Sequence, residues 1–179
     1  MARPAAPPVD PRLAVSEVTG AAAADLEVAM GEEAGLVRPR FERGCRAFAV
    51  RHSGALVGYG WLSKQPEWIG ELVLEITPRD GEAYVWNCVT LPPHRLRGVF
   101  RALLGHLVAL ARREGLRRLW IGSVDGGAER ALVAAGFAPV VRFRVANLGQ
   151  VRCLSLSRPV DVLSGKGRLR VFRIRNRRH

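Results

Sequence analysis

Residues Arg95 to Arg101 have the types and the spacing that suit an anion-binding turn. The segment reads Arg-Leu-Arg-Gly-Val-Phe-Arg, follows two prolines and a histidine, and leads directly into a long amphipathic stretch. Backbone N–H groups in the first turn of a helix face outward, and the helix dipole favours negative charge there. Arg95 and Arg97 add positive charge beside Gly98. We therefore predict that this turn cradles a phosphate or a pyrophosphate.

The turn lies between two elements that the hydrophobic pattern defines. Tyr84 to Thr90 is a largely apolar run, as expected for a buried central strand. The strand period places Glu82, Tyr84 and Trp86 on one face of it and Asn87 on the other. After the turn, apolar residues recur at helical spacing up to a glycine stop at Gly115. They are Val99, Leu103, Leu107 and Leu110, widened by Leu104, Val108 and Ala111.

The rest of the chain alternates between strand and helix patterns. Residues 46–52 and 55–63 flank a Ser-Gly turn and predict a β-hairpin. The other expected strands cover residues 13–18, 71–77, 118–124, 138–145 and 151–157. The other expected helices cover residues 21–33 and 127–135, with Thr19 and Asp125 as N-caps. Residues 36–44 are a linker or a second short helix, and 66–70 a loop. This order predicts an α/β fold with a mixed sheet.

The composition and charge of the chain indicate its partners and its domain organisation. The net charge of +12 and the pI near 11.3 predict an acidic partner: nucleic acid, an anionic surface or an anionic cofactor. Seven Lys or Arg residues and one acid fall in Asp161 to His179, so half of the net charge belongs to this tail. We expect a disordered segment over 1–11, one domain over 12–160, and a basic tail over 161–179.

The cysteines and the N-terminus indicate the compartment. The three cysteines are scattered, without metal-ligand or disulfide-framework spacing, so we expect no metal and a reducing, cytoplasmic setting. Pro7, Pro8 and Asp10 interrupt the apolar residues at the start of the chain, so we expect no signal peptide there. No apolar run reaches the ~20 residues that span a bilayer, and no membrane partner is expected.

The order of elements and the segment Arg95-Leu96-Arg97-Gly98-Val99-Phe100 together resemble the Gcn5-related N-acetyltransferase (GNAT) superfamily. That family's acyl-CoA signature is Arg/Gln-x-x-Gly-x-Gly/Ala, between its fourth strand and its third helix. Asp125-Gly-Gly-Ala128 with Gly136-Phe137 is similar to the family's Asn-x-x-Ala…Gly-Phe stretch. The resemblance covers residues 12–157. It implies a mixed, mostly antiparallel central sheet of about six to seven strands, flanked by helices.

The resemblance also implies a binding site for acetyl-CoA as co-substrate. The strand that ends at Cys88-Val89-Thr90 pairs with pantetheine and offers an N–H to the thioester carbonyl, and the amides of 97–101 hold the pyrophosphate. The CoA-binding residues are then Cys88, Val89, Thr90, Arg95, Leu96, Arg97, Gly98, Val99, Phe100 and Arg101. Two positions depart from the pattern. Phe100 replaces the last Gly/Ala, and Leu132 replaces a Tyr that often protonates the departing thiolate.

Several residues are candidates for the remaining chemistry. Glu82 is the candidate general base, with Glu71 and Glu75 as rivals, and the alternative for each is a solvated surface charge. His94 is a phosphate neighbour or an exposed side chain rather than the base. Cys88 lies in an apolar strand and is a core residue rather than a nucleophile. The aromatic residues line an acceptor cleft or belong to the core; they are Trp61, Trp68, Tyr84 and Trp86.

These observations predict an N-acetyltransferase that moves an acetyl group from acetyl-CoA to a primary amine, by direct attack in a ternary complex. Two alternatives stay open. One is a CoA-binding module of the same fold without catalysis, which Leu132 suggests. The other is a nucleic-acid-binding protein that uses the basic tail to contact RNA or another polyanion. A homodimer is also compatible with the sequence.

Overall fold

The computed structural model describes residues 10–70, 74–123, 126–148 and 151–157, and its core is a five-stranded sheet. The strands stand in the spatial order β1 (Leu13–Glu17), β2 (Arg46–His52), β3 (Ala55–Ser63), β6 (Glu82–Thr90) and β7 (Arg118–Ile121). Neighbours are antiparallel except for β6 and β7, which are parallel. This confirms the predicted α/β fold with a mixed, mostly antiparallel sheet.

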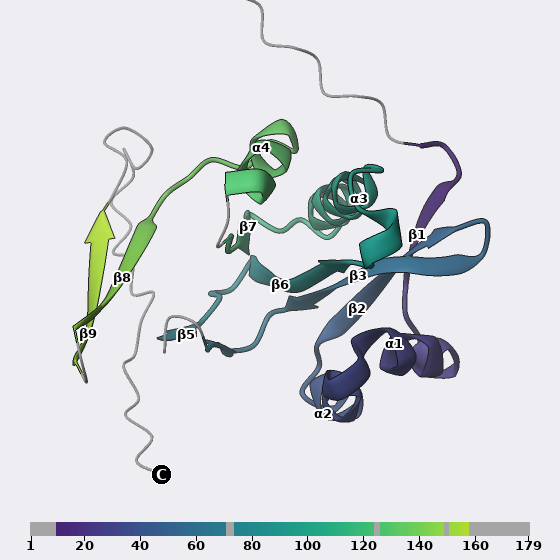
Figure 1. Cartoon of the computed structure of the whole chain (residues 1–179), viewed down its shortest axis with the longest axis horizontal. Coiled ribbons are helices and arrows are strands. Elements are labelled where there is room, and N and C mark those ends of the chain that lie inside the picture. The colour runs from purple at the N-terminus through teal and green to yellow at the C-terminus, as the bar shows by residue number, and fades with distance from the viewer. Residues whose placement is uncertain (1–9, 71–73, 124–125, 149–150, 158–179) are drawn as a thin grey trace, which may run out of the picture.

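Four further strands form two separate hairpins rather than extending the central sheet to six or seven strands. They are β4 (Glu67–Ile69) with β5 (Leu74–Ile76), and β8 (Arg142–Leu148) with β9 (Val151–Ser157). The β8–β9 hairpin stands apart from the central sheet (Figure 1).

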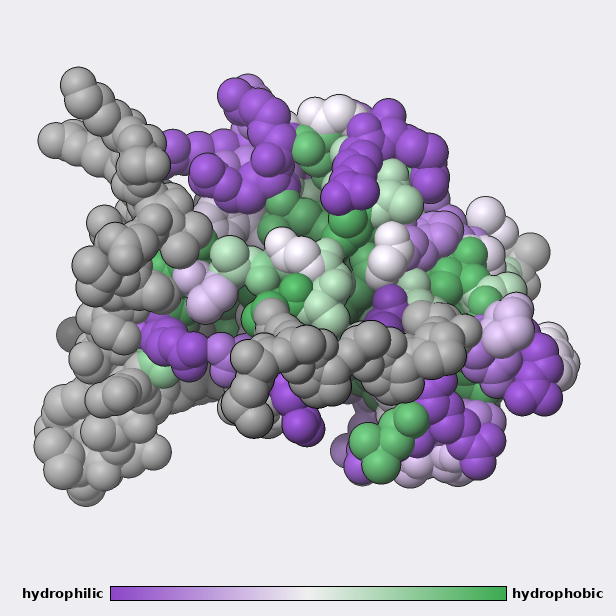
Figure 2. Space-filling view, turned by 90° about the horizontal axis from the view of Figure 1, so that it is seen from above, coloured by the Kyte–Doolittle hydropathy of each residue, from purple (hydrophilic) through white to green (hydrophobic). Residues whose placement is uncertain are grey.

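Helices cover both faces of the central sheet (Figure 1). α3 (Val99–Arg113) and α4 (Gly126–Ala134) lie on one side, and α1 (Ala23–Met30) and α2 (Val37–Glu42) lie on the other. Three short 3-10 turns complete the described helices: η1 (Gly20–Ala22), η2 (Gly31–Leu36) and η3 (Pro92–His94). Seen from the α3 side, apolar side chains occupy the middle of the surface and hydrophilic ones gather along its border (Figure 2).

Each face of the sheet has its own hydrophobic core. On the α3 side, Leu103 and Leu107 pack on Phe48 and Val50 of β2. Because successive strand residues point to opposite faces, Ala47 and its alternate neighbours join the second core. That core, on the α1 and α2 side, contains Val18, Leu26, Met30, Val37, Cys45, Ala47, Ala49, Tyr59 and Trp61. The predicted apolar stripe of α3 is confirmed.

Several predicted boundaries differ from the structure. The helix expected over 21–33 ends at Met30, because Gly31 has a φ of +56° and a 3-10 turn follows. Thr19 makes no side-chain cap; its carbonyl instead accepts the Ala22 amide at 2.9 Å. The 36–44 segment contains the short helix α2. The predicted loop over 66–70 was wrong, since it contains β4.

Some predictions fall on parts of the chain that the structure does not describe. They concern residues 1–9, Glu71, Asp125 and the basic tail, and they stay predictions. None of the described helices is both long enough and apolar enough to cross a membrane.

Candidate functional site

The last part of β6 has an open edge. Its first four residues pair with β7, from Glu82 opposite Arg118 to Val85 opposite Ile121. From Trp86 to Thr90, the described residues provide a neighbouring strand only on the β3 side. Backbone N–H and C=O groups along such an edge can pair with an extended ligand in the manner of an added strand. The predicted pantetheine segment Cys88-Val89-Thr90 lies on this edge.

The predicted phosphate turn follows directly. Leu91 still pairs with β3 through its amide, which donates to the Val57 carbonyl at 3.0 Å, and η3 then turns the chain towards α3. Gly98 is the N-cap of α3 with a φ of +82°, a left-handed conformation that glycine adopts without steric cost. The first intrahelical bond runs from the Ala102 amide to the Gly98 carbonyl, so the amides of 98–101 precede the helix ladder.

The side chains of this turn are open to solvent. Arg95, Leu96 and Arg97 are exposed, and Leu96 has a φ of +63° with its side chain fully exposed. A non-glycine residue held in the left-handed region costs about 1–3 kcal/mol and is found most often at functional sites. The structure therefore brings the open end of β6 and the basic turn together at the start of α3. Whether each of these residues binds CoA stays a prediction.

A β-bulge interrupts β6 where its edge opens. Trp61 stands opposite Trp86 and Tyr59 opposite Val89, so Gly60 alone faces two residues of β6. Asn87 is one of those two, with a φ of +44°. The prediction that Asn87 and Trp86 point to opposite faces was therefore wrong. The extra residue resets the alternation, and both side chains contact residues of the α1 and α2 side.

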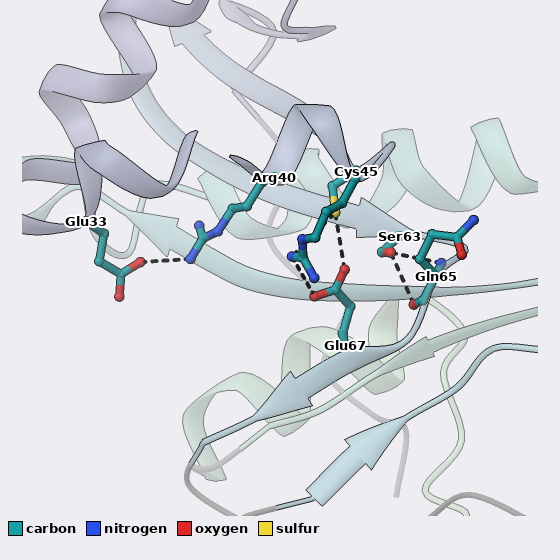
Figure 3. Close-up of polar contacts among 7 residues, drawn as sticks. Glu33, Arg40, Cys45, Ser63, Gln65 and Glu67 are labelled. Carbon is teal, nitrogen blue, oxygen red and sulfur yellow. Dashed lines mark hydrogen bonds and ion pairs between the residues drawn. The ribbon is translucent and has the colours of Figure 1, made fainter. Parts of the chain in front are cut away.

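An ion pair that the sequence did not indicate lies beside this bulge. Arg40 of α2 donates from Nη2 to Glu33 Oε2 at 3.1 Å (Figure 3). Asn87 Nδ2 donates to the same oxygen at 3.0 Å. The Arg40 guanidinium lies 4.5 Å from the Trp86 ring centroid and 5.2 Å from that of Trp61, within cation–π range. The Arg40 side chain is 8% exposed, whereas that of Glu33 is 54% exposed.

Two buried donors near this pair lack partners. Among the described residues, Nε1 of Trp61 and Nε1 of Trp86 have no hydrogen-bond acceptor. Leaving such a donor unsatisfied costs about 1–3 kcal/mol, and buried polar groups are otherwise almost always paired. Unsatisfied donors, a strained Asn87 and an interrupted strand thus occur together at one place in the fold.

Glu82, the predicted base, lies at the other end of β6. Its carboxylate accepts hydrogen bonds from Trp120 Nε1 at 2.9 Å and from Arg118 at 3.1 Å, and so links β6 to β7. Val89 lies seven positions further along the strand, which is roughly 23 Å. A general base works within hydrogen-bond reach or through one water. The role of Glu82 as general base therefore stays a prediction. At this distance Glu82 can act only through a chain of several water molecules.

The other predicted residues are divided between core and surface. Trp61 and Tyr84 are core residues, Trp86 is partly buried, and Trp68 is 46% exposed on β4. Glu75 is half-buried on the β4–β5 hairpin, and His94 ends η3. Burial raises the pKa of the Cys88 thiol to about 12, which supports its interpretation as a core residue.

Leu132 is buried in α4, and the Gly-Phe pair has a structural role. The amides of Gly136 and Phe137 donate to the Val133 and Leu132 carbonyls at 3.1 and 3.0 Å, and Gly136 has a φ of +92°. These two bonds form a Schellman cap that ends the helix. The Leu132 side chain is 8% exposed and cannot donate a proton.

A second polar cluster lies near the start of β2 (Figure 3). Glu67 is 3% exposed and accepts from Arg43 at 3.1 Å and from the Cys45 thiol at 3.2 Å. Burial, together with the hydrogen bond to Glu67, raises the pKa of Cys45 to about 11. The cluster therefore joins the segment between α2 and β2 to β4. No group of three or more His, Cys, Asp or Glu in the described part of the chain is arranged to hold a metal ion.

The open strand edge and the helix N-terminus of this mixed α/β protein are features that suit an extended, anionic ligand. The sequence model of the Acetyltransferase (GNAT) family matches residues 21–137, well over half of the chain. The protein therefore belongs to the GNAT acetyltransferase family.

Solved structures share this fold at low sequence identity. One is a ribosomal-protein-alanine N-acetyltransferase from Brucella melitensis biovar Abortus 2308, with 16% identity and a TM-score of 0.56 over 76% of this chain and 99% of that one. Another is AAC(6')-Iy in complex with the bisubstrate analog CoA-S-monomethyl-acetylneamine, with 14% identity and a TM-score of 0.55 over 79% and 99% of the two chains.

A third is a GNAT family acetyltransferase from Brucella melitensis in complex with acetyl-CoA, with 16% identity and a TM-score of 0.52 over 66% and 80% of the two chains. A search of curated protein sequences finds no match to this chain.

Proposed function

We propose that this protein transfers an acetyl group from acetyl-CoA to a primary amine within a ternary complex. The observation that carries the proposal is the open edge of β6 from Trp86 to Thr90, which leads directly into the glycine-capped start of α3. Membership of the GNAT family and the fold shared with an acetyl-CoA complex support the same co-substrate.

The chain has groups that fit each part of acetyl-CoA. Backbone groups of Cys88, Val89 and Thr90 on the open edge suit the amides of pantetheine, and an N–H among them suits the thioester carbonyl. The amides of 98–101 suit the pyrophosphate, and the exposed Arg95 and Arg97 add charge-assisted contacts. These residues orient the acetyl group for attack, and the orientation itself lowers the barrier.

The reaction needs no covalent enzyme intermediate. The neutral amine nitrogen bonds to the acetyl carbon as the bond from that carbon to sulfur breaks. The nitrogen gives up a proton to Glu82 or to a water chain, and the leaving thiolate takes up a proton. The burial of Cys88 argues against a thiol nucleophile, because the thiolate rather than the thiol reacts. With Leu132 in place of a hydroxyl, water supplies the proton to the thiolate.

Calorimetric titration tests the cofactor part of the proposal. Acetyl-CoA should bind the protein one to one, with an affinity that falls as salt rises, because phosphate contacts are largely electrostatic. An absence of binding would refute the proposed co-substrate.

A second candidate is a CoA-binding protein without catalysis, and Leu132 is the observation that favours it. In that case acetyl-CoA binds and no amine accelerates thiol release. An RNA contact through residues 161–179 stays a prediction, and loss of salt-sensitive RNA binding on deletion of that tail would support it. A cytoplasmic location and a homodimer also stay predictions.

A further inference from the structure

Glu33 has one fixed and one open carboxylate oxygen. Both of its hydrogen bonds, from Arg40 and from Asn87, end on Oε2. Within the described ranges no hydrogen bond ends on Oε1, and the side chain is 54% exposed. The carboxylate is therefore held in place on one side and available to a ligand on the other.

The support beneath Glu33 is rigid. The Arg40 side chain is 8% exposed and lies over the Trp61 and Trp86 rings, which themselves stand 6.2 Å apart. A buried guanidinium with aromatic neighbours and one carboxylate partner has few alternative positions. Arg40 therefore fixes where the Glu33 carboxylate lies (Figure 3).

Asn87 ties this carboxylate to the proposed site of transfer. Asn87 directly precedes Cys88, the first residue of the proposed pantetheine segment, and the bulge turns its side chain to the α1 and α2 side. The start of α3, with its phosphate-binding amides, lies on the opposite side of the sheet (Figure 1). An acceptor could therefore approach the thioester from the face on which Glu33 lies.

We infer that Glu33 binds the amino group of the acceptor, and that the acceptor is a cationic primary amine. The inference rests on the proposed function. An ammonium group donates to Glu33 Oε1, while Arg40 and Asn87 hold Oε2 and act as positioning residues. The ammonium loses one proton to water before the neutral nitrogen attacks the acetyl carbon.

The test uses the full chain and acetyl-CoA with a fixed panel of amines: spermidine, tyramine, kanamycin and a peptide with an N-terminal alanine. Glu33→Gln keeps the size of the side chain and an oxygen that can accept from Arg40 and Asn87, but removes the charge. Glu32→Gln is the matched control, since it removes the same charge one residue away. Asn87→Gly keeps the left-handed backbone and removes the amide contact.

With the amine that the wild type acetylates best, Glu33→Gln should raise KM about 10-fold or more, the effect of losing a charge-assisted hydrogen bond. The affinity for acetyl-CoA should stay unchanged, whereas the thermal midpoint should fall, because the buried Arg40 loses its charged partner. Asn87→Gly should raise KM less, and Glu32→Gln should leave KM within about twofold.

Three results would overturn the inference: an unchanged KM in Glu33→Gln, an equal rise in Glu32→Gln, or a parallel loss of acetyl-CoA affinity. Absence of turnover by the wild type with every amine would instead overturn the proposed function on which the inference rests.

Discussion

A Cβ atom on Gly58 would lie 2.6 Å from Cγ1 of Val99 and 2.8 Å from the Val89 carbonyl oxygen. Because Gly58 has no side chain, both the open end of β6 and the first residue of α3 can pack closely against β3 at this position. The close approach sets the position of the turn that we propose binds phosphate.

Gly58→Ala should displace the start of α3, since a backbone carbonyl is among the atoms that must move. We expect a loss of about 1–3 kcal/mol in the free energy of unfolding, as for other overpacked cores. Acetyl-CoA affinity should fall with it. Urea denaturation and calorimetry measure the two effects.

Gly105→Ala is the control for that substitution. Gly105 lies inside α3, and a Cβ there meets nothing within 4 Å among the described residues. Alanine should stabilise the helix by about 0.5–1 kcal/mol and leave acetyl-CoA affinity unchanged. If both variants had the same effect, close packing at Gly58 would not be the cause.

Arg97→Ala tests the phosphate turn without disturbing the core, because Arg97 is exposed. Acetyl-CoA affinity should fall about 10-fold or more, and the thermal midpoint should stay constant. Binding of S-acetylpantetheine, which lacks the pyrophosphate, should not change. Arg112→Ala in the last turn of α3 is the control. Equal losses for both ligands would contradict a pyrophosphate contact.

Cys88 should resist alkylation in the folded protein. Burial raises the pKa of the Cys88 thiol to about 12, so the reactive thiolate is scarce at pH 8. Mass spectrometry after iodoacetamide treatment should find Cys88 unmodified in the native protein and modified after unfolding. Cys88→Ala should retain kcat, whereas rapid native labelling, or a large loss of kcat in that variant, would reopen a nucleophilic role.

An ion-pair network makes stability depend on pH. Arg46 donates to Glu17 and Glu114, and these contacts lower the pKa of both carboxylates below their ordinary values. A depressed carboxylate pKa stabilises the fold above the unfolded pKa, and this contribution is lost as pH falls. The thermal midpoint should therefore drop from about pH 5 downward.

Arg46→Gln is the variant that isolates this effect. Without the guanidinium, neither carboxylate pKa is depressed by it, so the thermal midpoint should depend less on pH across the same range. An identical pH profile in the variant would exclude the network as the cause.

The sequence predicted those parts of the fold that depend on local patterns. The hairpin from Arg46 to Ser63 and the stripe of α3 follow from periods of 2 and 3.6 residues, and both are confirmed. The strand β4 was missed because three residues beside Pro66 carry too little pattern.

The polar site next to the bulge could not be predicted in the same way. The hydrogen bond from Asn87 to Glu33 joins residues 54 positions apart, and strand alternation placed Asn87 on the wrong face. A bulge can be recognised only from the register of the paired strands. The Arg40 contact can be recognised only from the packing of α2 against β3 and β6. The residue type offered one signal: asparagine adopts a positive φ more readily than most other non-glycine residues.

The central claim is acetyl transfer to an amine, and the most direct measurement follows both products. Purified protein is mixed with isotopically labelled acetyl-CoA and each amine of the panel, and CoA thiol release is compared with the mass of the amine. The account predicts thiol release that requires both protein and amine, with the labelled acetyl group on the amine nitrogen. Tight binding of acetyl-CoA without amine-dependent thiol release or labelled product would contradict it.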